Sequence, residues 1–322
     1  MQKRNFGRLG SVSALTLGGG GIGGVWGRTE RSEAVATVQA AIDSGITMLD
    51  VAPTYGGHEA ELVVGEALRA RPAPDVLITT KIGLPNEDAS DLGELMISSL
   101  RASLDRLGRS HADLFLLHSH LRPAGFSSAS PPETLGWQRY LDEVVPTFER
   151  LRQDGSIRAW GLTGVGHPQA VLDALRAESA IRPDAVQIVV NALDLTGDMW
   201  IFGTTDQPRN AELTAAAVQA DVSVIGIRAV AAGALSSTID RPVGSDDPTA
   251  ADYARAEPFR KLAAEFGESP ASLAHRYALT VTDVATVILG VKNRVELTEC
   301  LAAEARGTLT DAEVRSVLEL RG

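Results

Sequence analysis

Eight short apolar runs, each followed by a segment with helical periodicity, constrain the fold of this chain more than any other feature. The runs lack the alternation of apolar and polar residues that marks a half-exposed strand, which favours strands buried on both faces of a parallel sheet. They are predicted at 14–18, 46–50, 76–81, 113–118, 159–163, 185–191, 222–228 and 285–290. Eight βα units without a break in composition predict an α/β protein, a closed (β/α)8 TIM barrel that spans residues 1–322 as a single domain.

The two ends of the chain carry additions to the barrel. A hairpin is predicted over residues 3–13 and an extra amphipathic helix over 310–320, where Thr310 and Glu313 have the spacing of a capping box. Three long loops, 119–137, 192–209 and 229–257, all follow predicted strands. We therefore expect these loops at the C-terminal face of the barrel, where active sites of this fold lie.

Charge and cysteine content exclude several classes of protein. The net charge is −11 and no block is rich in Lys or Arg, which argues against nucleic acid or an anionic membrane as a partner. Cys300 is the single cysteine, so neither an intramolecular disulfide nor a cysteine metal cage can form. A reducing cytoplasm is the expected location, and a monomer or small homo-oligomer the expected state. No apolar run is long enough for a membrane span, and Arg8 with the following glycines argues against a signal peptide.

The segment from Gly18 to Gly23 satisfies G-x-G-x-x-G after a strand, the pattern of a dinucleotide-binding loop. In the Rossmann unit, however, the third glycine lies inside the following helix. Here residues 25–31 separate the glycines from Ser32, the first expected helix cap. The favoured interpretation is a flexible glycine-rich loop beside a pocket, with the cofactor bound elsewhere.

A more specific pattern lies at the ends of three successive predicted strands. Asp50, Lys81 and His118 each end a strand, and Tyr55 follows the second strand closely. A lysine ammonium next to a phenol stabilises the phenolate and lowers a pKa that is ordinarily about 10. Asp50 would keep Lys81 charged, Tyr55 would donate a proton to a carbonyl oxygen, and His118 would add a hydrogen bond. Each residue alone has another ordinary role, as a helix cap, a solvated charge or a structural hydrogen-bonding group, but together they suit carbonyl reduction.

At this point the sequence resembles the aldo-keto reductases. The resemblance rests on Asp50, Ala52, Tyr55, Gly56, Glu61 and Gly65, then Thr80 and Lys81, then the run from Asp113 to His118, in order and spacing. It covers nearly the whole chain and implies a barrel that uses NADPH or NADH to reduce an aldehyde or ketone, or to oxidise a sugar-like hydroxyl in reverse. The same resemblance implies Tyr55 as general acid/base, Asp50 and Lys81 as the groups that tune it, and His118 as the group that orients the carbonyl.

The resemblance also implies cofactor-binding residues toward the C-terminus. These are Thr163, Gln187, Asn191, Arg228, Gly233, Leu235, Gly290, Lys292, Asn293, Arg294 and Glu299. Departures from the family pattern occur at Thr163 with Gly164, where Ser-Asn is usual, at Arg228, where many members stack an aromatic ring on nicotinamide, and at Glu296 and Cys300. Lys292 and Arg294 could clamp a 2′-phosphate, whereas Glu296 would repel one. NADP(H) is therefore favoured over NAD(H), which stays as the alternative.

Three tryptophans, Trp26, Trp137 and Trp200, follow strands and are expected to line the substrate pocket. Two other functions remain open. A lyase or hydrolase on the same barrel would need paired carboxylates or metal ligands at the strand ends, and we expect no metal site. A non-catalytic cofactor-binding barrel, acting as a redox-sensing or partner subunit, would not need all of Asp50, Tyr55, Lys81 and His118.

Overall fold

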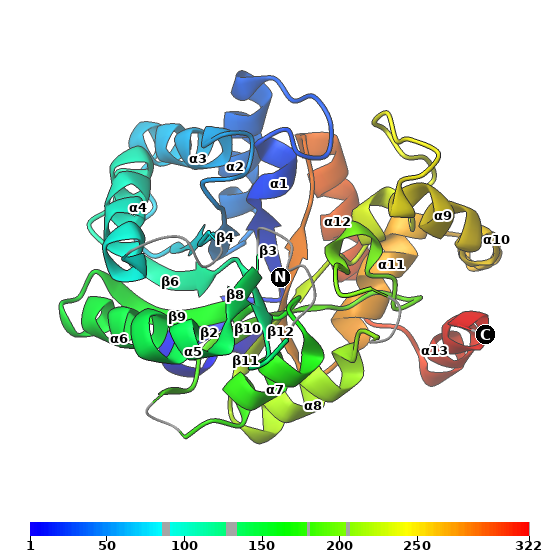
Figure 1. Cartoon of the computed structure of the whole chain (residues 1–322). Helices are drawn as coiled ribbons and strands as arrows, with labels where there is room; N and C mark the ends of the chain where they lie inside the picture. The colour runs from blue at the N-terminus through cyan, green and yellow to red at the C-terminus, as the bar shows by residue number, and fades with distance from the viewer. Residues whose placement is uncertain (86–90, 127–133, 179–180, 204–206, 322) are drawn as a thin grey trace.

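Eight parallel strands close into a barrel in the order β3-β4-β5-β6-β9-β10-β11-β12, with β12 paired to β3 (Figure 1). The computed structural model describes residues 1–85, 91–126, 134–178, 181–203 and 207–321. The barrel strands are β3 (Leu15–Gly18), β4 (Met48–Asp50), β5 (Leu77–Ile82), β6 (Ala112–Leu117), β9 (Ile157–Thr163), β10 (Ala185–Val189), β11 (Ser223–Ile227) and β12 (Val284–Leu289). The predicted fold is confirmed. The predicted strands ran too far at His118, Asn191 and Arg228, each of which lies just beyond its strand.

Helices surround the barrel as an outer ring (Figure 1). They are α2 (Arg31–Asp43), α3 (Glu59–Ala70), α4 (Leu92–Leu107), α6 (Val145–Gln153), α7 (Pro168–Leu175), α8 (Asn210–Gln219), α10 (Glu257–Glu265), α11 (Pro270–Thr280) and α12 (Arg294–Arg306). In α4, Asp91 caps the first turn by accepting a 2.9 Å hydrogen bond from Glu94 N, and Gly108 ends the helix in the left-handed conformation. Among the described residues, no helix combines the length and apolar composition that a bilayer crossing needs.

The predicted hairpin is confirmed, since β1 (Lys3–Asn5) pairs antiparallel with β2 (Ser11–Ser13). Phe6, Leu9 and Val12 of this hairpin are buried in one cluster with Met48, Leu114 and other strand residues. The hairpin therefore supplies apolar side chains to one end of the barrel interior. On the outer face of β6, Phe115 packs on Phe148 of α6 with ring centroids 5.5 Å apart.

All three predicted loops contain secondary structure that the sequence did not reveal, and within 192–209 it is the 3-10 turn η4 (Gly197–Met199). Within 119–137, β7 (His120–Arg122) pairs with β8 (Thr134–Gly136), and α5 (Trp137–Arg139) runs through the π-helical turn η2 (Tyr140–Val144) into α6. Within 229–257, η5 (Ala231–Gly233) is followed by α9 (Pro248–Arg255), which Asp247 caps at Thr249 N. Apart from α9, these elements have at most 5 residues and are too short to show clear periodicity. In the loops 119–137 and 192–209, residues 127–133 and 204–206 lie outside the described residues.

The prediction of a flexible glycine-rich loop after the first barrel strand is wrong. Residues Gly19–Ile22 form a short helix, α1, and Gly19, Gly21 and Ile22 are buried. The following helix α2 begins at Arg31 rather than at a Ser32 cap. The glycines serve close packing at this end of the barrel, because side chains there would collide with neighbouring segments.

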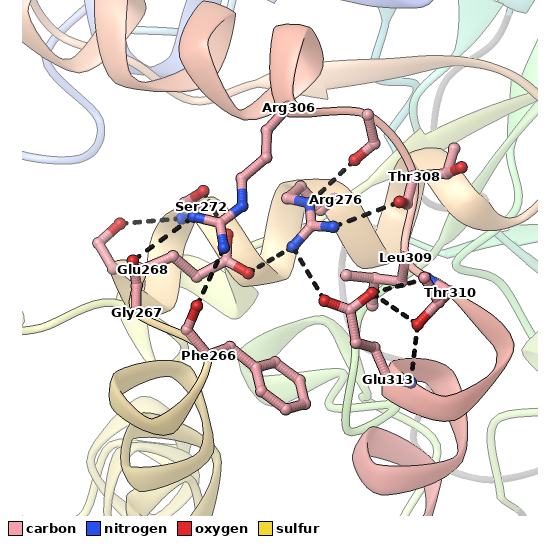
Figure 2. Close-up of polar contacts among 12 residues, drawn as sticks. Phe266, Gly267, Glu268, Ser272, Arg276, Arg306, Thr308, Leu309, Thr310 and Glu313 are labelled. Carbon is pink, nitrogen blue, oxygen red and sulfur yellow. Dashed lines mark hydrogen bonds and ion pairs between the residues drawn. The ribbon is translucent and has the colours of Figure 1, made fainter.

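The predicted C-terminal helix is present as α13 (Asp311–Leu318), and Thr310 and Glu313 form the predicted capping box. A buried guanidinium joins this segment to the rest of the protein (Figure 2). Arg276 Nη1 lies 2.6 Å from Glu268 Oε1 and 3.6 Å from Glu313 Oε1, and Nε donates to the carbonyl of Gly307. Beyond α13, the turn η6 (Glu319–Arg321) ends in a guanidinium that donates to the backbone carbonyls of Asn191 and Ala192, after β10.

Candidate active site

Three neighbouring strands bring the first predicted catalytic residues to one end of the barrel. Asp50 is the last residue of β4, Lys81 lies one residue before the end of β5, and His118 directly follows β6. Because β4, β5 and β6 pair in parallel, their carboxyl ends face the same way. Tyr55 lies in the turn between β4 and α3, where Gly56 adopts a φ of +65° that favours glycine.

A buried ion pair lies at the centre of this group. The Lys81 ammonium pairs with Oδ1 of Asp50 and also donates a 3.0 Å hydrogen bond to the carbonyl of Val51. The exposed fractions of the Lys81 and Asp50 side chains are 0% and 2%. Gln187 on β10 donates a 2.8 Å hydrogen bond to Oδ2 of Asp50. Both carboxylate oxygens are thus engaged, which fixes the direction of the lysine.

The Tyr55 ring lies between this ion pair and the histidine. Lys81 Nζ is 4.7 Å from the centroid of the Tyr55 ring. The rings of Tyr55 and His118 meet edge to face, with centroids 5.7 Å apart and planes 84° apart. The structure therefore brings all four predicted catalytic side chains together.

Burial dominates the protonation of these groups. It raises the pKa of Tyr55 above the usual phenol value, and the nearby Lys81 ammonium opposes this only in part. The predicted lowering of the Tyr55 pKa is therefore wrong as a net effect, although the lysine acts in the expected direction. Burial also lowers the pKa of His118 to about 3, with Lys81 and His120 adding to the effect. At neutral pH the site holds a phenol and a neutral imidazole.

The two members of the ion pair respond differently to burial. For Lys81, burial acts to lower the pKa, but the Asp50 carboxylate and smaller contributions from its other contacts outweigh burial, and the pKa is raised. Burial raises the pKa of Asp50, against the opposing effects of Lys81 and Gln187. Lys81 keeps its proton because its charged partner lies beside it.

The residues expected at the adenosine end of a cofactor lie around the start of α12. Asn293 caps this helix by accepting a 3.0 Å hydrogen bond from Glu296 N. Lys292 pairs with Asp240 and, at 2.7 Å, with Glu296, while Arg294 binds both carboxylate oxygens of Glu33 at 3.0 and 2.8 Å. Two cations at a helix N-terminus suit a phosphate. Lys292 and Arg294 already have carboxylate partners, so a 2′-phosphate would have to replace these carboxylates. Glu296 would repel a phosphate, and it is also one of the partners of Lys292.

Several other predicted cofactor residues already take part in local contacts. Asn191 uses its side-chain amide within its own loop, donating to Leu195 O at 2.8 Å and accepting from Leu195 N at 2.9 Å. Thr163 donates to the carbonyl of Leu117 at 3.1 Å, and Glu299 accepts from the Ser269 hydroxyl. Leu235 is buried, and Gly233 has a φ of +97°.

The three predicted pocket tryptophans have different environments. Trp26 contacts Arg228 and Arg241, whose guanidinium carbons lie 5.0 and 5.2 Å from its ring centroid, and it lies beside Gly290. Trp200 packs on Phe202 with centroids 5.6 Å apart. Trp137 is partly buried and packs on the buried Tyr140, with ring centroids 5.4 Å apart.

Sequence reasoning missed the residues that organise these loops. Phe126, His167 and Phe202 form an aromatic cluster with Trp200 and His120. Asp198 pairs with Arg228 at 2.9 Å. The one feature of the sequence that these residues share is that they lie in segments that follow barrel strands. Within the described ranges, no group of three or more His, Cys, Asp or Glu residues is arranged to hold a metal ion.

Comparison with known families matches residues 14–321 to the model described as the Aldo/keto reductase family. The chain belongs to the aldo/keto reductase family. It is accordingly an NAD(P)H-dependent oxidoreductase, and the family membership supports carbonyl reduction as its general chemistry.

Relatives differ in how much of the chain they match. An uncharacterized oxidoreductase of Bacillus subtilis (strain 168), YqkF, is 27% identical over 335 residues, covering 98% of this chain and 95% of the relative. The L-galactose dehydrogenase of Arabidopsis thaliana is 32% identical over 168 residues, covering 51% of this chain and about half, 49%, of the relative.

Solved structures agree with the fold. The aldo-keto reductase AKR11C1 from Bacillus halodurans, in its holo form, has a TM-score of 0.72 at 22% identity, covering 99% of this chain and 96% of the other. An aldo-keto reductase from Klebsiella pneumoniae, solved in complex with NADPH, has a TM-score of 0.69 at 21% identity, covering 100% and 96%.

Proposed function

We propose that this aldo/keto reductase reduces an aldehyde or ketone to an alcohol, with Tyr55 as the general acid. The observation that carries the proposal is the buried Lys81 ammonium, held by Asp50 and lying 4.7 Å from the Tyr55 ring centroid, with His118 at the ring edge. A bound nicotinamide cofactor would supply the hydride for the carbonyl carbon. Tyr55 would supply the proton for the carbonyl oxygen, and neutral His118 would donate a hydrogen bond to that oxygen.

The protonation states favour reduction. Because burial raises the pKa of Tyr55, the phenol carries its proton at neutral pH, as a general acid must. Once that proton leaves, the ammonium of Lys81 would stabilise the phenolate, and Asp50 would keep that ammonium in place. Oxidation of an alcohol in the reverse direction would require Tyr55 to lose its proton first, at higher pH.

For the cofactor we propose a preference for NADPH over NADH. Lys292 and Arg294 would hold the 2′-phosphate at the start of α12 after exchanging carboxylate partners for phosphate oxygens. The Klebsiella pneumoniae reductase bound to NADPH is in keeping with this preference. A methylglyoxal reductase of Escherichia coli (strain K12), 28% identical over 172 residues, is described as NADH-specific and represents the alternative.

As the substrate class, we propose a small polar carbonyl compound or its alcohol. Relatives named for L-galactose, methylglyoxal and pyridoxal support this breadth. We also propose that residues 1–322 act as a single domain and that the enzyme works in the cytoplasm, in keeping with its lone and buried Cys300.

The test is oxidation of NADPH with 4-nitrobenzaldehyde, comparing the wild-type enzyme with Tyr55→Phe. We expect turnover by the wild type and its loss in the variant with NADPH binding retained. Equal and negligible rates in both, with NADPH still bound, would instead favour the non-catalytic cofactor-binding subunit. A preference of more than about tenfold for NADH in kcat/KM would contradict the cofactor assignment, since tenfold corresponds to a clear energetic difference of about 1.4 kcal/mol.

A further inference from the structure

The glycine run after β3 does not bind a dinucleotide in Rossmann fashion, yet it lies directly against the candidate catalytic tyrosine. Helix α1 begins at Gly19, immediately beyond the strand. A Cβ atom on Gly19 would lie 3.1 Å from Cδ2 of the Tyr55 ring, 3.0 Å from the Ala60 Cβ and 3.0 Å from Cγ1 of Val51. Carbon atoms in good contact are about 3.5–4.0 Å apart, so a side chain here would force its neighbours to move.

The Tyr55 ring is the neighbour that would give way. Val51 and Ala60 are each 0% exposed; Val51 directly follows β4 and Ala60 belongs to α3, so packed segments hold both in place. The Tyr55 ring is only partly buried and can turn about its side-chain bonds. A methyl group at position 19 would therefore displace the ring relative to Lys81 and His118.

A second set of contacts holds the backbone of the same turn. A Cβ on Gly23 would lie 3.1 Å from the carbonyl oxygen of Tyr55 and 3.1 Å from the Ala60 Cβ. A Cβ on Gly56 would collide with the Gly23 carbonyl. The α1 turn and the Tyr55 turn thus meet in close backbone contact.

We propose that Gly19 is a positioning residue for the reaction, because its missing side chain leaves the space in which the Tyr55 ring meets Lys81 and His118. The requirement is one of space and not of backbone conformation, because Gly19 is absent from the positive-φ glycines. Alanine would favour the helical backbone of α1 but would not fit against the ring. The inference rests on the proposed function, in which Tyr55 is the general acid.

The Gly19→Ala variant tests the proposal with 4-nitrobenzaldehyde and NADPH. We expect kcat to fall by about 10- to 100-fold, because a displacement of about 1 Å at a reacting group costs up to about 100-fold in rate. The affinity for NADPH, measured by fluorescence titration, should stay within about threefold, a difference of under 1 kcal/mol. In alcohol oxidation, the pH at which kcat rises should also move upward, since Tyr55 moves away from the Lys81 ammonium.

Gly244→Ala is the matched control, because a Cβ on Gly244 meets nothing within 4 Å and its φ is not positive. It should leave kcat and the pH profile unchanged. The double variant Gly19→Ala/Ala60→Gly removes one of the three close contacts and should recover part of kcat. If Gly19→Ala does not fold, the same comparison is made with the double variant against Ala60→Gly alone.

An unchanged kcat and pH profile in Gly19→Ala would overturn the proposal. So would a loss that lies entirely in NADPH affinity, since that would make Gly19 a cofactor-binding position. Tyr55→Phe separates this failure from failure of the proposed function. An active Tyr55→Phe enzyme would rule out Tyr55 as the general acid, and with it the proposed function. An inactive Tyr55→Phe enzyme together with a fully active Gly19→Ala enzyme would rule out only the positioning role of Gly19.

Discussion

Gln187 donates a 2.8 Å hydrogen bond to Oδ2 of Asp50, the carboxylate oxygen opposite the one that pairs with Lys81. This contact joins β10 to β4 across the barrel and connects a residue expected to bind the cofactor to the candidate catalytic ion pair. If Gln187 contacts the cofactor as expected, this one side chain would link cofactor binding to the orientation of Lys81.

Asp50→Asn should therefore reduce both stability and activity. The buried ammonium of Lys81 would lose its counter-charge, and breaking a buried pair in this way costs about 3–5 kcal/mol. Chemical denaturation should show that loss, and kcat should fall because Lys81 no longer holds a full charge beside Tyr55. Asp43→Asn, which breaks the exposed pair with Arg71, is the control and should change neither measurement. An Asp50→Asn enzyme as stable as the wild type would contradict a charged Lys81.

The low pKa of His118 predicts how stability depends on pH. With a pKa of about 3 in the folded protein against an ordinary value of 6.5, His118 binds its proton more readily when the chain is unfolded. Between these two pH values the unfolded state carries more protons, so the free energy of unfolding should fall as the pH is lowered through that window. His118→Gln should show a shallower slope in urea denaturation at a series of pH values. An identical slope in both proteins would mean that His118 titrates normally.

The raised pKa of Tyr55 predicts different pH profiles for the two directions of the reaction. Reduction needs the phenol and should stay level through neutral pH, declining only above about 10, where an ordinary tyrosine titrates. Oxidation needs the phenolate and should rise steadily over the same range. Steady-state measurements of kcat against pH in both directions check this. Tyr55→Phe should abolish most of the activity and remove the pH dependence from whatever activity is left. A reduction profile that falls near pH 7 would show that Tyr55 has a lowered pKa instead.

Glu33 competes with any phosphate for Arg294, since it binds the guanidinium through both carboxylate oxygens. Glu33→Gln should lower KM for NADPH by about 2- to 5-fold, as expected for a surface charge worth at most about 1 kcal/mol, and leave KM for NADH unchanged. Glu30→Gln, which disturbs only the exposed pair with Arg28, is the matched control. An equal change for both cofactors would show that Arg294 does not contact the 2′-phosphate.

Arg276 should matter for stability and not for catalysis. Arg276→Met would leave Glu268, whose side chain is 2% exposed, as an unpaired buried carboxylate, at a cost of about 3–5 kcal/mol. The double variant Arg276→Met/Glu268→Gln should recover part of that loss in thermal unfolding, because the buried charge is gone. Values of kcat should match the wild type in the folded range. If kcat fell strongly at temperatures where the variant is still folded, Arg276 and its partners would instead influence the candidate active site.

The order of strands and the four residues at the strand ends could be predicted because both depend on local pattern. Apolar runs identify strands, and the polar residues that end them stand out against those runs. The contacts of Gln187 and the space around Gly19 could not be predicted, because they depend on which side chains meet across the barrel. The packing of Trp137 on Tyr140 was hidden for the same reason, because nothing in the sequence around Trp137 shows that the two rings would meet. Two carboxylate partners, Asp240 for Lys292 and Glu33 for Arg294, come from distant segments and were equally hidden.

The seam between β12 and β3 pairs Leu15 with Val287 and Leu17 with Leu289, so the first and last strands of the barrel must meet before it closes. During synthesis, β3 to β6 leave the ribosome long before their final partner exists. In a nascent chain, Asp50 and Lys81 would therefore sit at the end of an open sheet that water can enter, where their charges are easily tolerated. The burial that raises the pKa of Tyr55 depends on the closed barrel, so we expect catalytic competence to appear only after β12 has paired with β3.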